Sequence, residues 1–106
     1  MARVALLCPD LLFGSRVEGA LRAAGHEVER FDSPEQVMEH DVLVVDLEAV
    51  ELGGQWTVDG GRKTVGFYPH VDQDLRRRAE QAGFDVVVPR SRMARETAAV
   101  VEKVLS

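Results

Sequence analysis

Apolar residues along the chain follow two alternating spacings, which together predict strands separated by helices. Short continuous apolar runs are typical of strands buried on both faces, and such runs lie at residues 3–8 and 42–46. Between the runs, apolar residues recur every three or four positions, which is the spacing of one helix face. We expect five strands, at residues 3–8, 26–31, 42–46, 64–68 and 85–88.

The helices are predicted by their apolar stripes and by the residues that begin and end them. Gly25 follows the first stripe and can adopt the left-handed conformation that ends a helix. A short helix is expected to begin at Ser33, and Ser91 is expected to cap the last helix. Residues 47–62 are expected to be mostly loop, with at most a short helix at 48–53. The three longer stripes comprise Phe13, Val17, Ala20, Leu21 and Ala24; Val71, Leu75, Ala79 and Ala82; and Met93, Thr97, Val100, Val101 and Val104.

Strands and helices that alternate with short connections predict βαβ units and a parallel sheet covered on both faces. Five strands in 106 residues favour a flavodoxin-like three-layer αβα sandwich, formed by one domain over residues 1–106, with strand order 2-1-3-4-5. Chemistry in such sheets gathers at the carboxyl ends of the strands, near the switch between the first and third strands. The residues expected there are Cys8, Pro9, Asp10, Asp32, Asp46, Pro69, His70, Pro89 and Arg90.

Composition excludes several classes of protein. A chain that is 45% hydrophobic with a net charge of −5 is not typical of a disordered protein. A single cysteine, Cys8, can form no intramolecular disulfide and is too little for a cysteine-based metal site. No apolar run approaches the ~20 residues of a membrane span, and the N-terminal run is too short for a secretory signal. We therefore expect a cytoplasmic protein without a membrane partner.

The order of the predicted segments resembles a response-regulator receiver domain over nearly the whole chain. Residues 1–33 are similar to the first strand, first helix and second strand of a receiver. Residues 41–47, Asp-Val-Leu-Val-Val-Asp-Leu, resemble its third strand, which ends in the aspartate that receivers phosphorylate, here Asp46. Residues 79–85 resemble the join into the fifth strand. The resemblance implies a phospho-acceptor position at Asp46.

The chain departs from the receiver pattern at most of the positions that assist phosphorylation. Receivers hold a divalent metal with an acid pair after the first strand, and this pair aligns with Cys8-Pro9. The assisting serine or threonine falls at Tyr68 or Pro69. The lysine aligns near Pro89, with Arg90 beside it. These departures predict a pseudo-receiver, in which the fold is kept and the phosphorylation site is degenerate.

Two readings of Asp10 stay open at this point. Asp10 and Asp46 could hold a cation together, which would give weak magnesium binding. We expect no other cofactor. Otherwise Asp10 begins the first helix, where its charge favours the positive end of the helix dipole. Arg90 is the candidate assistant, although its planar guanidinium does not reproduce the point charge of a lysine.

Charge is distributed unevenly along the chain. Residues 1–61 contain four Arg or Lys against twelve Asp or Glu, whereas residues 62–106 contain nine against six. The resemblance implies that the face made by the fourth helix, fifth strand and last helix binds a protein partner or a second copy; a solvated helix face is the alternative. The net negative charge and the absence of a helix-turn-helix pattern argue against nucleic acid. The candidate surface comprises Arg76, Arg77, Arg78, Arg92 and Arg95.

These observations predict a stand-alone signalling or regulatory module that acts through protein–protein interaction and is not an enzyme. The alternative is a functional phospho-accepting receiver of a two-component system, which uses Asp46 with help from Asp10 and Arg90. For Cys8, a small buried thiol is favoured over a phosphocysteine, because Pro9-Asp10 offers no glycine-rich phosphate cradle.

Overall fold

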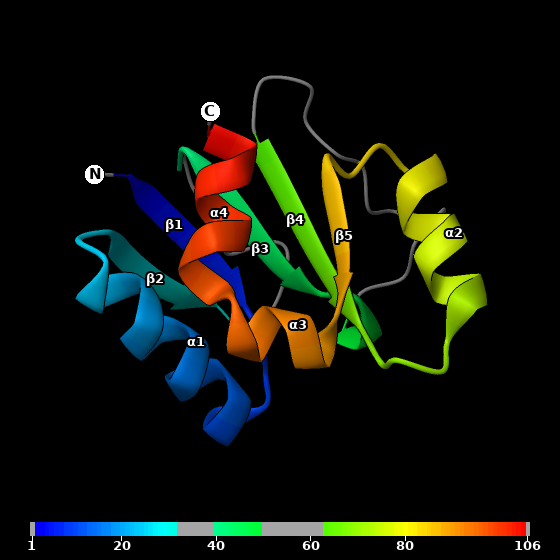
Figure 1. Ribbon diagram of the computed structural model, residues 1–106, viewed down its shortest axis with the longest axis horizontal. Helices are drawn as coiled ribbons and strands as arrows, with labels where there is room; N and C mark the ends of the chain where they lie inside the picture. Colours follow the sequence, from blue (N-terminus) through cyan, green and yellow to red (C-terminus); the bar gives the residue numbers. More distant parts are fainter. Residues whose placement is uncertain (1, 32–39, 50–62, 106) are drawn as a thin grey trace.

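The computed structural model describes residues 2–31, 40–49 and 63–105 of the chain. Within these ranges the strands form a five-stranded parallel sheet in the order β2-β1-β3-β4-β5, which confirms the predicted fold and strand order (Figure 1). The strands are β1 (Arg3–Leu7), β2 (Glu27–Phe31), β3 (Val42–Asp46), β4 (Lys63–Tyr68) and β5 (Val86–Pro89).

Helices cover both faces of the sheet and divide the apolar core into two layers. On one face lie α1 (Leu11–Ala23), α3 (Arg90–Arg95) and α4 (Thr97–Leu105), which cover the side chains of Val4, Leu6, Val44 and Phe67. On the other face lies α2 (Gln73–Gln81), whose Ala79 packs in a cluster with Ala5, Leu7, Leu43 and Val45. Successive strand residues therefore alternate between the two layers, as the pleat of a strand requires.

The first helix begins and ends as the sequence predicts. Asp10 is its N-cap, and the Asp10 side chain accepts a hydrogen bond from the backbone N–H of Phe13. Val17 and Leu21 are fully buried on the inner face. The chain then turns at Gly25, whose φ of 93° lies in the region that glycine adopts without steric strain.

The C-terminal helix predicted as one element consists of two helices. The last turn of α3 breaks at Glu96, with φ −125° and ψ 36°, and α4 starts at the next residue. The Thr97 hydroxyl donates a 2.6 Å hydrogen bond to the carbonyl of Met93 across this break. The prediction that Ser91 caps the helix was wrong, because α3 follows β5 directly and its N-cap position is Pro89, which makes no side-chain capping bond.

Val71, which the sequence predicts to lie on a helix stripe, lies instead in the turn before α2 and is 81% exposed. The helix begins later because Asp72 caps it, accepting a hydrogen bond from the backbone N–H of Leu75. A single 3₁₀ turn, η2 (Leu47–Ala49), follows β3 among the described residues. The helix expected at Ser33, and most of the expected loop at 47–62, lie outside the described residues.

The topology brings the carboxyl ends of β1, β3 and β4 side by side. Leu7 pairs in register with Val45, and Asp46 pairs with Phe67. The loops that leave these strands therefore meet at one edge, where β5 also ends. Among the described residues, no helix has the length and apolar character needed to cross a membrane.

Candidate functional site

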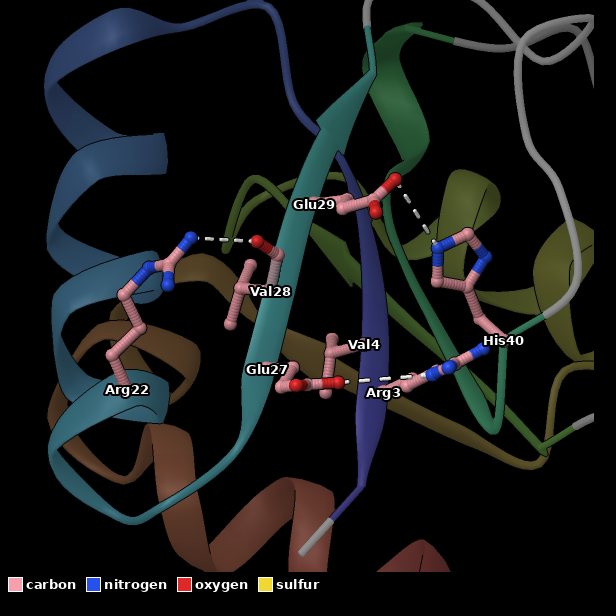
Figure 2. A pocket seen from close by; sticks show the side chains of 7 residues that line it. All are labelled: Arg3, Val4, Arg22, Glu27, Val28, Glu29 and His40. Atoms are coloured by element: carbon pink, nitrogen blue, oxygen red, sulfur yellow. Dashed lines mark hydrogen bonds and ion pairs between the residues drawn. The ribbon is translucent and has the colours of Figure 1, made fainter.

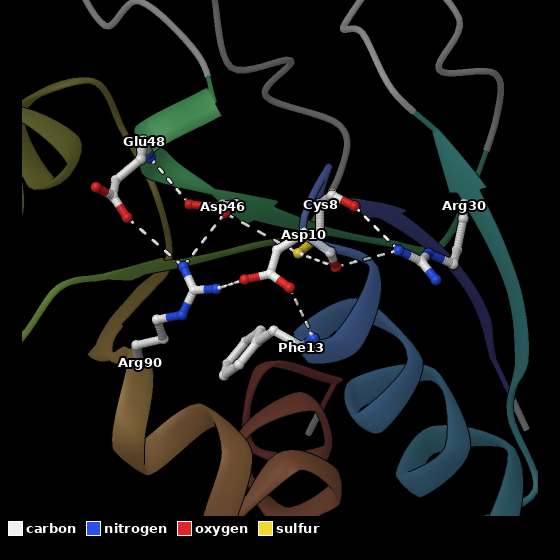
Figure 3. A network of polar contacts seen from close by, with 7 residues as sticks. All are labelled: Cys8, Asp10, Phe13, Arg30, Asp46, Glu48 and Arg90. Atoms are coloured by element: carbon white, nitrogen blue, oxygen red, sulfur yellow. Dashed lines mark hydrogen bonds and ion pairs between the residues drawn. The ribbon is translucent and has the colours of Figure 1, made fainter.

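Three carboxylates surround one guanidinium at the carboxyl edge of the sheet (Figure 3). Asp10 lies at the end of the loop after β1, Asp46 is the last residue of β3, and Glu48 lies in η2. Arg90 is the first residue of α3, directly after β5. The structure thus brings together the three site residues predicted from the sequence, Asp10, Asp46 and Arg90, and adds Glu48.

Arg90 binds these carboxylates unequally. Its Nη2 donates a 2.6 Å hydrogen bond to Oδ2 of Asp10. Its Nη1 lies 3.5 Å from Oδ2 of Asp46 and 3.5 Å from Oε1 of Glu48, which are the distances of ion pairs rather than of short hydrogen bonds. One positive charge therefore faces three negative charges, and its shortest contact is with Asp10.

Aromatic rings support the guanidinium from the side of the core. The Cζ of Arg90 lies 4.2 Å from the centroid of the Phe13 ring and 5.9 Å from that of Phe67. The two rings are 5.0 Å apart, and Phe67 is fully buried. A cation over an aromatic face is attracted by the negative charge density of the ring. The cation–π contacts and the ion pairs together fix the position of the Arg90 head group.

The two aspartates have opposite pKa shifts although they share Arg90. Burial raises the pKa of Asp46, which is only 5% exposed, and this outweighs the Glu48 backbone N–H and the Arg90 charge, which lower it. The backbone N–H of Phe13 lowers the pKa of exposed Asp10, and Arg90 lowers it further. The pKa of Asp46 therefore stays raised beside a guanidinium, because the effect of burial outweighs that of the Arg90 charge.

Cys8 is a free, buried thiol, as predicted. Its Sγ lies 3.7 Å from the carbonyl oxygen of Asp10 and 4.0 Å from Oδ2 of Asp46. Burial, followed by the negative charge of Asp46, raises the pKa of the thiol. Cys8 is thus held in its neutral form, which is neither the nucleophilic form nor the metal-binding form of cysteine.

A second arginine, Arg30 of β2, reaches the same loop from the other side. Its Nη2 donates hydrogen bonds to the backbone carbonyls of Cys8 (3.2 Å) and Asp10 (3.4 Å), and its Nη1 donates to the Ser15 hydroxyl at 3.3 Å. Gly14 of α1 leaves the space for this side chain, because a Cβ there would collide with the Arg30 guanidinium. Arg30 was not predicted as a site residue. The sequence does carry one signal for it, because Arg30 is a charged residue on the same strand face as buried Val28.

The described residues do not fit the divalent metal that the resemblance to receivers implies. Magnesium prefers several oxygen ligands in octahedral geometry. Within residues 2–31, 40–49 and 63–105, no group of three or more His, Cys, Asp or Glu side chains is arranged to hold a metal ion. Asp10 and Asp46, the predicted ligands, both face the Arg90 guanidinium, whose positive charge opposes a second cation. Metal binding by this pair stays a prediction.

The predicted basic surface carries its own counter-charges. On α2, Arg76 lies 3.8 Å from Glu80, while Arg77 and Arg78 lie 3.3 Å and 3.7 Å from Asp74. All these side chains are about half exposed or more, so each ion pair is weak. Three arginines and two acids leave α2 with a small positive charge.

The other two arginines of that surface share a single counter-charge. Arg92 and Arg95 lie 3.6 Å and 3.4 Å from the same carboxylate, that of Glu96. Because α2 and α3 cover opposite faces of the sheet, the five arginines lie on either side of the edge strand β5 (Figure 1). They form two small basic patches rather than one.

A charged groove follows the opposite edge strand, β2 (Figure 2). Its polar groups bind one another: Arg3 lies 3.7 Å from Glu27, His40 lies 3.8 Å from Glu29, and Arg22 donates a 2.8 Å hydrogen bond to the carbonyl of Val28. Arg3 and Glu27 begin their strands, so the groove lies toward the amino ends of the strands, away from Asp46. The groove therefore adds no group to the acidic edge, which is formed by Asp10, Asp46 and Glu48. Its lining residues are Arg3, Val4, Arg22, Glu27, Val28, Glu29 and His40.

The structure is similar to solved response-regulator structures over nearly its whole length. A response regulator from Thermotoga maritima matches it with a TM-score of 0.73 at 16% identity, covering 97% of this chain and 96% of that chain. A response regulator receiver protein from Burkholderia phymatum matches with a TM-score of 0.79 at 17% identity, covering 99% and 95%. NtrX from Brucella abortus has a TM-score of 0.79 at 16% identity, covering 98% of this chain but 27% of NtrX. No protein-family model and no curated protein matches the sequence.

These matches define the class of the fold: it is that of a response-regulator receiver domain. The resemblance found in the sequence is thereby confirmed for the fold. At this level of identity the matches carry no residue roles.

Proposed function

We propose that the chain is a receiver-type signalling module that acts by protein contact, with a phosphorylation site that is neutralised from within. The observation that carries this proposal is the contact of Arg90 with both Asp10 and Asp46. In this arrangement the guanidinium compensates the charges of the protein itself. It is not available as a free charge for an incoming phosphoryl group.

The chemistry of phosphoryl transfer supports the same conclusion. The transferring group carries negative charge, so catalysis depends on nearby cations and hydrogen-bond donors. Here the acceptor Asp46 is buried, and Asp10 and Glu48 add negative charge beside it. Pro69 brings no hydroxyl, and Tyr68 is 3% exposed. We therefore expect no enzymatic activity, and signalling through a docked partner instead.

The second candidate function is a phospho-accepting receiver that uses Asp46. One observation favours it: Asp46 is the last residue of β3, with the Arg90 cation 3.5 Å away. In this candidate, phosphorylation of Asp46 would draw Arg90 away from Asp10.

Incubation with acetyl phosphate and magnesium, followed by intact-mass measurement, separates the two candidates. We expect no phosphoryl mass increment in the native chain. An increment that Asp46→Asn abolishes would overturn the proposal in favour of the second candidate. Asp41→Asn is the matched control, because Asp41 is an exposed carboxylate at the opposite end of β3.

For docking we propose a second copy of the chain, in which the acidic residues of its first half meet the arginines of α2. The support is the charge difference between residues 1–61 and residues 62–106. Gel filtration with light scattering at low and high salt should show association that weakens with salt and with Arg76→Glu plus Arg77→Glu. Arg3→Glu plus Arg16→Glu changes the charge equally at exposed positions elsewhere and should retain association. A monomer under all conditions would refute self-association.

A further inference from the structure

The loop at residues 8–10 is held by guanidinium groups from two sides (Figure 3). Arg90 binds the Asp10 carboxylate at 2.6 Å, and Arg30 donates to the carbonyls of Cys8 and Asp10. The two arginines come from different elements, α3 and β2, and both are largely shielded, with side chains 26% and 23% exposed. The chain therefore supplies two cations at the edge where the receiver fold implies a metal.

We propose that Arg30 and Arg90 are resident cations that fix the β1–α1 loop in place of a divalent ion. The arrangement of the acidic edge would then not depend on metal. This inference rests on the proposed function and deepens it, because it names what holds the degenerate site in shape.

The surroundings of Arg90 support a fixed rather than a mobile cation. The guanidinium packs against Phe13, and the Phe13 ring rests on the fully buried Phe67. Phe13 also donates its backbone N–H to Oδ1 of Asp10, whose Oδ2 binds Arg90. Asp10 and Phe13 thus bind each other as well as Arg90, so the ion pair, the helix cap and the ring contact reinforce one another.

The surroundings of Arg30 are equally specific. Backbone carbonyls that accept from a guanidinium form charge-assisted hydrogen bonds, which are stronger than neutral ones. The Arg30 guanidinium lies in the space that Gly14 leaves on α1, with the Ser15 hydroxyl as a further partner. Any larger residue at position 14 would displace it.

The three carboxylates around Arg90 predict how substitutions of Asp10 and Arg90 combine in their effect on Tm. Without it, Asp10, Asp46 and Glu48 would repel one another. Asp10→Asn removes one of these charges and keeps a good helix cap, since asparagine caps as well as aspartate. We therefore expect Asp10→Asn to lower the Tm of the native chain, but to leave unchanged or raise the Tm of the Arg90→Gln variant. An effect of Asp10→Asn that depends in this way on Arg90 distinguishes a resident cation from an incidental surface contact.

The experiment measures Tm for the native chain, both single variants and the double variant, each in EDTA and in magnesium chloride. The native chain should have the same Tm in both solutions, and Arg90→Gln should lower it. A divalent ion at a hundred times its dissociation constant would raise Tm by roughly 10 °C or more, which is easily detected. Arg92→Gln is the control, because Arg92 lies on the same helix and does not face the acidic edge.

Two results would overturn the inference: a saturable rise of the native Tm with magnesium, or an Asp10→Asn effect that is the same with and without Arg90. If Arg90→Gln does not fold, Arg90→Lys replaces it and should also weaken the dependence on Asp10, because lysine lacks the planar group that faces Phe13. Phosphorylation of Asp46 by acetyl phosphate would refute the proposed function without changing these Tm values. The two failures are therefore distinguishable.

Discussion

Gly66 of β4 lies against Leu47, the residue that follows Asp46, so Gly66→Ala tests how tightly the acidic edge is packed. A Cβ built at position 66 would lie 2.9 Å from Cδ2, 3.0 Å from Cδ1 and 3.1 Å from Cγ of Leu47. Carbon atoms normally approach to about 3.5–4.0 Å. Leu47 is 1% exposed and therefore has little room to move away.

The magnitude follows from two opposing effects. Adding a methyl group to a packed core costs about 1–3 kcal/mol. Replacing glycine by alanine within a strand stabilises the chain by roughly 0.5–1 kcal/mol, because the unfolded chain loses freedom. Three contacts near or below 3.1 Å place the steric cost in the upper half of its range. We expect Gly66→Ala to lower the free energy of unfolding by about 1–2 kcal/mol, which corresponds to about 4–8 °C in Tm for each kcal/mol.

Urea unfolding of Gly66→Ala is compared with that of Gly19→Ala. No atom lies within 4 Å of a Cβ at Gly19 in α1, so that substitution should stabilise the chain by roughly 0.5–1 kcal/mol. The steric explanation also predicts that Leu47→Ala costs less in the Gly66→Ala background than its usual value of about 2–5 kcal/mol. A Gly66→Ala variant as stable as the native chain, or equal costs of Leu47→Ala in both backgrounds, would refute the reasoning.

Two further predictions concern the neighbours of the site. Gly14→Ala should stabilise the chain less than the matched Gly19→Ala, as measured by urea unfolding. The substitution should be net destabilising if the Arg30 hydrogen bonds that it displaces have the usual value of about 1.5–3 kcal/mol for charged partners. Because the pKa of Asp10 is lowered, its ionised side chain stabilises the fold. This contribution to the free energy of unfolding is complete above the ordinary aspartate pKa and is lost as pH falls below that value. Asp10→Asn should remove this part of the loss of stability in acid. Because the pKa of Asp46 is raised, its ionisation destabilises the fold as pH rises through that pKa, so Asp46→Asn should stabilise at pH 7 and have less effect near pH 3; the opposite trend in unfolding free energy would contradict this assignment.

The fold was predictable because apolar runs alternate with helix stripes along the chain, and this alternation indicates βαβ units and a parallel sheet. The run that ends at Asp46 reads as a strand buried on both faces, and all five residues of β3 are buried. The helix break at Glu96 was not predictable, since Met93, Thr97 and Val100 keep the spacing of a single continuous stripe. All three are buried across the break, so the spacing alone does not distinguish one helix from two.

The site was predictable only as far as strand ends determine it. Parallel topology places Asp10, Asp46 and Arg90 at one edge, whatever their rotamers. The contact of Arg90 with Asp10 joins residues 80 positions apart, and its distance depends on side-chain packing against Phe13. The pairing on α2 was readable, because Arg76 and Glu80 are four residues apart and face each other on a helix. The total charge of a surface does not reveal such pairs, because it adds the charges of residues that neutralise one another.

The unequal sharing of Arg90 couples Asp10 to Asp46. Arg90 is 2.6 Å from Asp10 and 3.5 Å from Asp46, and the Asp10 charge itself raises the pKa of Asp46. Asp10→Asn removes that charge and releases the guanidinium for Asp46, and both changes favour the ionised form of Asp46. Carboxyl ¹³C NMR should therefore show a lower pKa for Asp46 in Asp10→Asn than in the native chain. Asp41→Asn, at the other end of β3, should leave it unchanged. An Asp46 pKa that does not move in Asp10→Asn would show that burial alone determines it and that Arg90 is not shared.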